Sequence, residues 1–196
     1  MPYKAKRFTL TLASAAGLAL ASLGGIGLSG VAIAGAKVPM VGGAAMYPTK
    51  NIVENAVNSK DHTTLVAAVK AAGLVQTLES PGPFTVFAPT NAAFAKLPAG
   101  TVETLLKPEN KATLVKVLTY HVVPGRLTAA DIMAKIKAGH GKAMLKTVEG
   151  GDLTAEMKGG KLVLIDAKGG MATVTQANVM QSNGVIHVTN AVSLPG

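Results

Sequence analysis

The spacing of apolar residues changes once along the chain, near Lys142. Between residues 51 and 119 apolar residues recur three and four positions apart, which is the period of amphipathic helices. After Lys142 they alternate with polar residues, which is the period of half-buried strands. Because helices come first and strands later, the pattern predicts an α+β fold. We expect an N-terminal helical layer packed on a small, mostly antiparallel β-sheet or wedge.

One early strand differs from this division because it is apolar on both faces. The sequence Phe84–Ala88 contains apolar or β-favouring residues at odd and even positions, so we expect it to be buried on both sides. Pro83 and Pro89 bound it, since proline lacks the N–H group that a central strand donates. Thr90 or Asn91 is then expected to cap a short helix.

Capping residues predict where the other helices begin and end. Asn51, three positions before Glu54, predicts a capping box at the start of the first helix. We expect Asp61 to cap a second helix, which ends at Gly73 in the left-handed conformation. The apolar pattern predicts further helices at residues 101–106, 108–119 and 128–133.

Turn residues predict the remaining strands. Residues 120–123 are apolar and predict a short strand that ends before Gly125. The pair Gly159-Gly160 predicts a tight turn between two strands. The pair Asn183-Gly184 predicts a second hairpin with a type I′ turn, in which both central residues need positive φ.

The first 34 residues predict an export signal peptide. Three cations, Lys4, Lys6 and Arg7, precede an uncharged apolar run, and residues 32–34 form a small-x-small cleavage site. We expect residues 35–48 to be a connector and residues 49–196 to be one domain, located in the periplasm or at the cell surface. The apolar run would also suffice to cross a bilayer, which takes about 20 residues, so a retained membrane anchor is the alternative.

Composition makes several classes of function improbable. The chain has no cysteine, which excludes disulfides, thiol catalysis, thiolate metal sites and a lipid-attached cysteine. Its net charge of +9 would fall to +6 on removal of the three N-terminal cations. The lysines are scattered and 4% of residues are aromatic. We therefore expect no nucleic-acid binding, and only weak attraction to an anionic cell surface.

The sequence gives no support for an enzyme. Residues 25–30 match the dinucleotide-binding glycine pattern, but they lie inside the expected export signal and follow no strand. The chain contains no nucleophile elbow, HExxH zinc motif or phosphate loop. We therefore predict no catalytic residues and no cofactor.

The four histidines, His62, His121, His140 and His187, are far apart in the sequence. We interpret His121 and His187 as buried imidazoles with both ring nitrogens hydrogen-bonded. The alternative is a copper site, since imidazole and methionine thioether groups suit copper. Nothing at ligand spacing supports that alternative, so the prediction is no metal.

Three segments together resemble the fasciclin (FAS1) domain family over about residues 47–195. Residues 84–98 resemble the family's first signature, residues 183–195 its second, and Tyr120-His121 its central Tyr-His pair. The resemblance implies a fasciclin-like fold but no particular chemistry, because one fold can carry many functions. It assigns structural roles to the signature residues Phe84, Val86, Phe87, Ala88, Pro89, Asn91, Phe94, Asn183, Gly184, Ile186 and His187.

The resemblance also implies a function in recognition: an exported bacterial interaction or cell-adhesion module that works as a monomer. In animal members the Tyr-His strand and an Asp-Ile pair before the second signature are linked to integrin adhesion. This chain has an asparagine in place of that aspartate, which argues against an integrin as its partner. We expect a cell-surface protein or glycan to bind an exposed face at Tyr120, His121, Asn178, Val179 and Met180.

A carrier of an apolar ligand is the alternative function. Some algal proteins of this family resemble carriers that hold a carotenoid in an apolar groove. The many small apolar side chains of this chain, with its methionines, would suit a groove for a carotenoid or lipid. Such a groove would leave apolar surface uncovered in the empty protein.

Overall fold

A computed structural model describes residues 38–196 of the chain. The expected export signal, residues 1–34, lies outside the described residues. The expected connector is wrong from Met40 onward, because this segment forms a small hairpin of β1 (Met40–Val41) and β2 (Ala44–Ala45). Val41 is 6% exposed and Met46 is 2% exposed, so the hairpin packs into the core of the domain.

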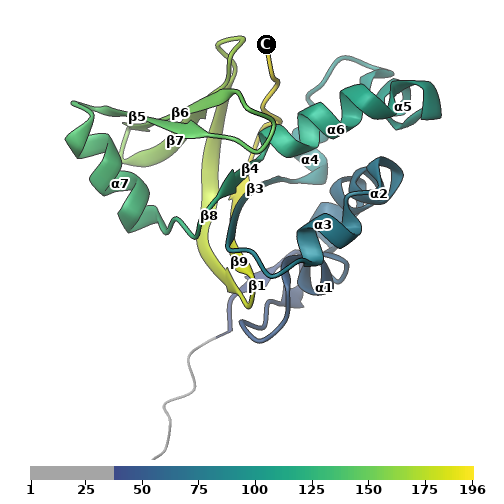
Figure 1. Ribbon diagram of the computed structural model, residues 1–196, viewed down its shortest axis with the longest axis horizontal. Helices are drawn as coiled ribbons and strands as arrows, with labels where there is room; N and C mark the ends of the chain where they lie inside the picture. Colours follow the sequence, from purple (N-terminus) through teal and green to yellow (C-terminus); the bar gives the residue numbers. More distant parts are fainter. Residues whose placement is uncertain (1–37) are drawn as a thin grey trace, which may run out of the picture. The chain divides into compact units, whose positions relative to one another are not determined.

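The described residues form an α+β fold, as predicted, in which most helices precede most strands (Figure 1). The helices are α1 (Ile52–Ala56), α2 (Thr63–Ala72), α3 (Val75–Glu79), α4 (Asn91–Phe94), α5 (Thr101–Leu106), α6 (Lys111–Tyr120) and α7 (Ala129–Ala138). Two short 3₁₀ helices are η1 (Lys60–His62) and η2 (Pro108–Asn110). The strands after the hairpin are β3 (Phe84–Pro89), β4 (Val122–Pro124), β5 (Lys142–Lys146), β6 (Asp152–Lys158), β7 (Lys161–Ile165), β8 (Met171–Gln181) and β9 (Gly184–Thr189).

Seven of these strands form one sheet in the order β4-β3-β9-β8-β7-β6-β5. All neighbouring pairs are antiparallel except β3 and β9, which run parallel from Phe84 beside Gly184 to Pro89 beside Thr189. A Cβ atom at Gly184 would overlap the carbonyl oxygen of Phe84. Glycine is therefore required where these two strands begin to pair.

The sheet has a hydrophobic cluster on each face. Helices α1, α2, α3 and α6 pack with β3 and β9 in the first cluster, and α7 packs on β5, β6 and β7 in the second (Figure 1). The long strand β8 joins the two halves and carries irregular register between Val174 and Val179. Two faces of one bent sheet are thus covered by separate groups of helices.

Most capping predictions are confirmed. Asn51 forms the predicted capping box with Glu54, and Gly73 ends α2 with a φ of 74°. Thr90 caps α4 through Ala93 N–H, so of the two candidates Thr90 is the cap. Asp61 is not the cap of α2, because it lies within η1 and α2 begins at Thr63.

Two strand predictions need correction. Tyr120 is the last residue of α6 and His121 follows in a turn, so only residues 122–124 form the strand predicted at 120–123. The second hairpin is present, but Gln181 pairs with Gly184 and the turn residues are Ser182 and Asn183. Neither Asn183 nor Gly184 has positive φ, so the type I′ assignment is wrong.

Candidate ligand cavity

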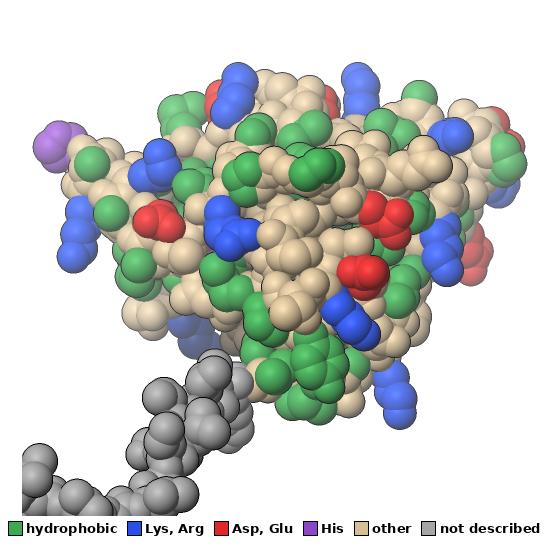
Figure 2. Space-filling view, turned by 60° about the horizontal axis from the view of Figure 1, so that its bottom comes forward, with side chains coloured by type: hydrophobic (Ala, Val, Ile, Leu, Met, Phe, Trp, Pro, Cys, Tyr) green, Lys and Arg blue, Asp and Glu red, His purple; other side chains and the backbone are tan. Residues whose placement is uncertain are grey.

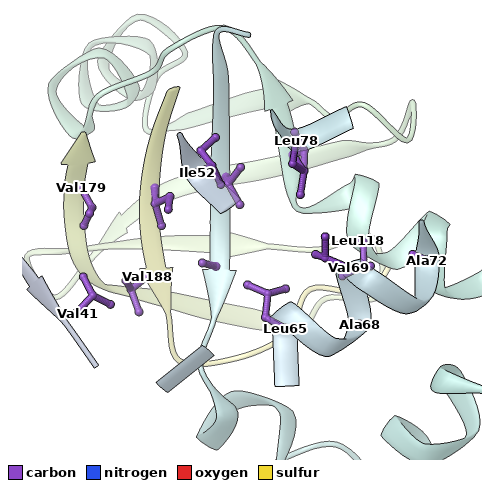
Figure 3. Close-up of a cluster of buried hydrophobic side chains, with 14 of the residues drawn as sticks. Val41, Ile52, Leu65, Ala68, Val69, Ala72, Leu78, Leu118, Val179 and Val188 are labelled. Atoms are coloured by element: carbon purple, nitrogen blue, oxygen red, sulfur yellow. The ribbon is translucent and has the colours of Figure 1, made fainter. Parts of the chain in front are cut away.

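A largely apolar cavity lies beneath the helical layer, between the helices of the first cluster and strands β3 and β9. Its volume is about 80 Å³, several times the roughly 10–15 Å³ that one water molecule requires. Figure 3 shows side chains that line it from helices α1, α2, α3 and α6, from β1 and from the seven-stranded sheet. Among the labelled residues these are Val41, Ile52, Leu65, Val69, Leu78, Leu118 and Val179.

One end of the cavity reaches the protein surface. Of the residues that line it, Lys70 of α2, Thr77 of α3 and Val148 of the turn after β5 are exposed. The accessible lining of the cavity is almost wholly apolar, so Lys70 and Thr77 line it mainly with carbon atoms.

His62 lines the same cavity and is 4% exposed. Its Nδ1 lies 2.9 Å from the hydroxyl oxygen of Ser59, whereas its Nε2 has no hydrogen-bond partner. Burial lowers the pKa of His62, and the nearby Ala88 carbonyl and the charge of Asp61 oppose this shift without reversing it. His62 is therefore a neutral imidazole whose Nε2 is fully enclosed by the protein, with the Ala88 carbonyl close to the ring.

His121 also lines the cavity, but both of its ring nitrogens are hydrogen-bonded, as predicted. Nδ1 lies 2.8 Å from the Val117 carbonyl oxygen, and Nε2 accepts a hydrogen bond of 3.0 Å from the Ser193 N–H. Burial lowers its pKa, and the hydrogen bond to Val117 and the charge of Asp166 oppose the shift. His121 thus fastens the C-terminal segment to the end of α6.

The prediction for His187 is confirmed in the same way. Its Nε2 lies 2.8 Å from the Leu127 carbonyl oxygen, and its Nδ1 accepts a weak hydrogen bond of 3.4 Å from the Asn178 N–H. Burial lowers its pKa, and the hydrogen bond to Leu127 opposes the shift. The ring stacks on Phe87 with centroids 5.6 Å apart, and the Asn178 side chain accepts a hydrogen bond from the Ala129 N–H. These contacts connect β9, β8 and the start of α7.

The predicted partner-binding face does not form as expected. Tyr120 is 1% exposed, His121 is 3% exposed and Val179 is 0% exposed, whereas Asn178 is exposed and Met180 is partly buried. The two apolar clusters bury Tyr120 and Val179, and hydrogen bonds to the backbone occupy His121. The expectation that these five residues share an exposed face is therefore wrong.

Residues of both signature segments are buried or form hydrogen bonds with other segments of the fold. Phe87, Ala88 and Ile186 are buried in the sheet. The Asn91 side chain accepts from the Thr64 N–H and donates to the Lys60 carbonyl, so it joins α4 to the start of α2. Asn183 makes three further hydrogen bonds to the backbone of other segments. The two signatures hold the cavity's helices and strands together.

The sequence analysis did not identify His62 as a site residue. The signal available was a histidine at the start of a helix whose buried stripe includes Leu65 and Val69. Its partner Ser59 lies three positions before it. Whether this histidine is enclosed depends on packing between η1 and β3, which a sequence pattern does not encode.

Charged groups do not gather into one patch on the face drawn in Figure 2, where Lys and Arg side chains are spread among acidic ones. Within residues 38–196, no three His, Cys, Asp or Glu side chains lie close enough together to hold a metal ion. No helix in that part of the chain is long and apolar enough to cross a membrane.

The three buried histidines predict a loss of stability in mild acid. Each has a folded-state pKa below 6.5, so the unfolded chain takes up more protons. Their stabilising contribution is complete above pH 6.5 and is lost as pH falls through the lowered folded-state pKa values. The slope is at most about 1.4 kcal/mol per pH unit for each histidine. Urea unfolding at pH values from about 8 to about 5 measures it.

A surface histidine provides the control for this pH dependence. His140 is exposed, so His140→Ala should leave the slope unchanged, whereas His187→Phe should reduce it. Hydrogen bonds from Thr128 lower the pKa of Asp131 below 3.8. Protonation of Asp131 therefore also reduces stability as pH falls, but only in stronger acid. A free energy of unfolding that stays constant over the whole pH range would contradict the prediction.

Comparison with known proteins is consistent with this fold. The family model described as "Fasciclin domain" matches residues 60–195. Protein sll1483 of Synechocystis is 52% identical over 159 residues, which cover 81% of each chain. Immunogenic protein MPB70 of Mycobacterium bovis is 36% identical over 145 residues, covering 71% of this chain and 66% of that protein.

A solved structure shows the same architecture. It contains a FAS1 domain pair from the insect cell adhesion molecule Fasciclin I, and it aligns with a TM-score of 0.65 at 18% sequence identity. The alignment covers 73% of this chain and 50% of that one. With the family model spanning most of the described residues, these matches show that the chain belongs to the fasciclin domain family.

Proposed function

We propose that this protein is an exported, non-catalytic binding module whose ligand site is the apolar cavity beneath the helical layer. The cavity is the observation that carries the proposal, because protein interiors rarely contain voids larger than a water molecule. At about 24 cal/mol per Å³, leaving 80 Å³ empty costs about 2 kcal/mol. The space is about half that of a cavity that holds benzene, roughly 150 Å³, so a small apolar group or one end of a longer apolar ligand would fill it and recover those contacts.

Two further features support binding rather than catalysis. His121 and His187 are hydrogen-bonded to the backbone at both ring nitrogens, so neither is free to act as a general base. The signal-like first 34 residues support export to the periplasm or cell surface. Together these features favour a protein that holds a molecule outside the cytoplasm.

The proposal predicts a bound apolar molecule in protein purified from its own host. Native mass spectrometry and an absorption spectrum should show an extra mass in stoichiometric amount, or visible absorption if the ligand is a carotenoid. If the signal is cleaved, the mass of the polypeptide should correspond to a chain that begins near Gly35. A bare polypeptide that also fails to take up added lipids or carotenoids would contradict the carrier function.

A cavity-filling variant locates the binding site. Val69 lines the cavity and is 8% exposed, so Val69→Phe should reduce ligand binding at least tenfold. Val57 is 47% exposed and does not line the cavity, so Val57→Phe is the matched control. Equal binding by both variants would place any ligand elsewhere.

Adhesion is a second candidate function, favoured by the structural likeness to a cell adhesion molecule. In this account the exported domain binds a cell-surface protein or glycan through its outer surface, assisted by scattered positive charge. Beads coated with the protein should then attach to host cells, and attachment should weaken at high salt. Val69→Phe, which fills an interior site, should leave that attachment unchanged.

A further inference from the structure

We propose that the outer face of the β1–β2 hairpin is a contact surface for a lipid bilayer, with the ring of Tyr47 at the level of the lipid headgroups. The inference goes beyond the proposed function, because the residues of this outer face do not line the cavity. It concerns how the domain lies against a membrane, whatever the cavity holds.

The hairpin has one buried face and one outward face. Val41 and Met46 point inward and are 6% and 2% exposed. The strand pairing continues past Met40, because the Met46 N–H donates to the Pro39 carbonyl at 2.9 Å. Since side chains alternate along a strand, the outward face carries four apolar residues: Val38, Met40, Ala45 and Tyr47.

This outward face leaves apolar surface in contact with water. Met40 is 56% exposed and Tyr47 is 46% exposed. In Figure 2, hydrophobic side chains gather beside the point where the grey residues meet the described ones. Apolar side chains that are grouped in this way, rather than scattered singly, are typical of interaction surfaces.

The backbone of Tyr47 is held in place although its ring is exposed. Its N–H donates to Oδ1 of Asn55 at 3.1 Å, and its carbonyl accepts from Nδ2 of Asn55 at 2.8 Å. Asn55 is 0% exposed. Gln176 of β8 donates to the Met40 carbonyl at 3.2 Å, which ties the hairpin to the sheet. Because this backbone is already ordered, contact through the ring costs little further conformational entropy.

The side chains of this surface suit the boundary between membrane and water. Among the Phe and Tyr side chains of the described residues, Tyr47 is the exposed one. The Lys50 ammonium lies 5.4 Å from the centroid of the Tyr47 ring. Tyrosine is enriched at membrane interfaces, and lysine can lay its methylene groups along apolar surface while its ammonium stays in the headgroup region. An exposed aromatic ring beside a cation therefore fits a lipid surface.

The place of the hairpin in the chain favours a bilayer over a protein partner. The uncharged run of the expected export signal continues to Ala36, and Met40 follows four residues later. If this run is retained as a membrane anchor, the short connection keeps the hairpin at high effective concentration beside the bilayer. A few weak apolar contacts are then enough to orient the domain. If the run is cleaved, the same face keeps a weak affinity for lipid.

Paramagnetic NMR tests the inference, because it detects weak and brief contacts. ¹⁵N-labelled protein purified from its own host is mixed with phosphatidylcholine bicelles that carry a gadolinium chelate on some headgroups. We expect the amide signals from Met40 to Tyr47 to broaden at least threefold more than those of the exposed turn at Gly159-Gly160. Equal broadening at both places, or stronger broadening at the turn, would overturn the proposal.

Variants connect this broadening with the outward side chains. Tyr47→Ser and Met40→Ser should each reduce the excess broadening of the hairpin signals at least twofold. Met144 is 69% exposed on β5, so Met144→Ser is the matched control and should leave the excess unchanged. An excess that survives in Tyr47→Ser would overturn the role of the ring. Uptake of a cavity ligand should be the same in Tyr47→Ser as in the unmodified protein, so failure of the membrane contact and failure of the proposed function are distinguishable.

Discussion

Replacement of Tyr120 by alanine should lower the free energy of unfolding by about 3–5 kcal/mol. Tyr120 is 1% exposed and lies in the second hydrophobic cluster, so truncation removes a large side chain from a packed interior. Its hydroxyl donates to the Asp152 carbonyl at 2.7 Å and accepts from the Ala167 N–H at 3.1 Å. Tyr120 thereby joins the end of α6 to the β5–β7 half of the sheet.

A second variant separates packing from hydrogen bonding. Tyr120→Phe keeps the ring but leaves the Ala167 N–H without its acceptor, so we expect a loss of roughly 1–3 kcal/mol. Tyr47, which is 46% exposed, is the control, and Tyr47→Ala should cost less than about 1 kcal/mol. The chain has no tryptophan, so far-ultraviolet circular dichroism in urea is the suitable measurement.

This experiment also distinguishes the two roles considered for Tyr120. If Tyr120 contacted an external partner, its replacement would weaken binding and barely change stability. The structure predicts the reverse, because the side chain is enclosed by its own domain. A stability of Tyr120→Ala within about 1 kcal/mol of the unmodified protein would contradict the structural role.

Burial of His62, His121 and His187 links the cavity to the stability of the domain. Two of these histidines use both ring nitrogens to hold backbone segments together, and the third, His62, lies 2.9 Å from the Ser59 hydroxyl through its Nδ1. All three therefore help to define the interior of the domain.

Sequence patterns predicted the features that depend on neighbouring residues. The capping box at Asn51, the left-handed end of α2 at Gly73 and the buried strand β3 each follow from a few adjacent side chains. The same local reasoning extended a strand back to Tyr120, because an apolar run fits a helix end and a strand equally well. Packing of Tyr120 against distant strands decides for the helix.

Other features depend on residues far apart in the sequence. The parallel pairing of β3 with β9 joins segments about 100 residues apart, and no turn residues in the sequence indicate this pairing. Asn178, with a φ of 59°, lies in an irregular part of β8 where local alternation fails. The cavity itself is a space left between helices and a sheet, so it appears only when the packing of all these elements is known.

Asn183→Ala should lower the free energy of unfolding by about 2–4 kcal/mol, because one amide group satisfies three backbone groups. Its Oδ1 accepts from the Ile52 N–H at the start of α1 at 3.0 Å. Its Nδ2 donates to the carbonyls of Leu78 at 2.7 Å and Ser80 at 3.0 Å, at the end of α3. The β8–β9 turn thereby holds two helices that line the cavity, and urea unfolding measures the loss.

Asn183→Asp tests the same arrangement with nearly the same shape. The carboxylate keeps an acceptor for Ile52 but places negative charge against two carbonyl oxygens, so its pKa should be raised and the variant destabilised at neutral pH. Protonation restores a donor, so the deficit relative to the unmodified protein should shrink as pH falls below the raised pKa. Asn58, whose exposed side chain bonds the Glu54 carbonyl, is the control, and Asn58→Ala should cost less than about 0.5 kcal/mol. Equal stability of Asn183→Ala and Asn58→Ala would show that the buried amide contributes little, and that packing alone holds α1 and α3 beside the sheet.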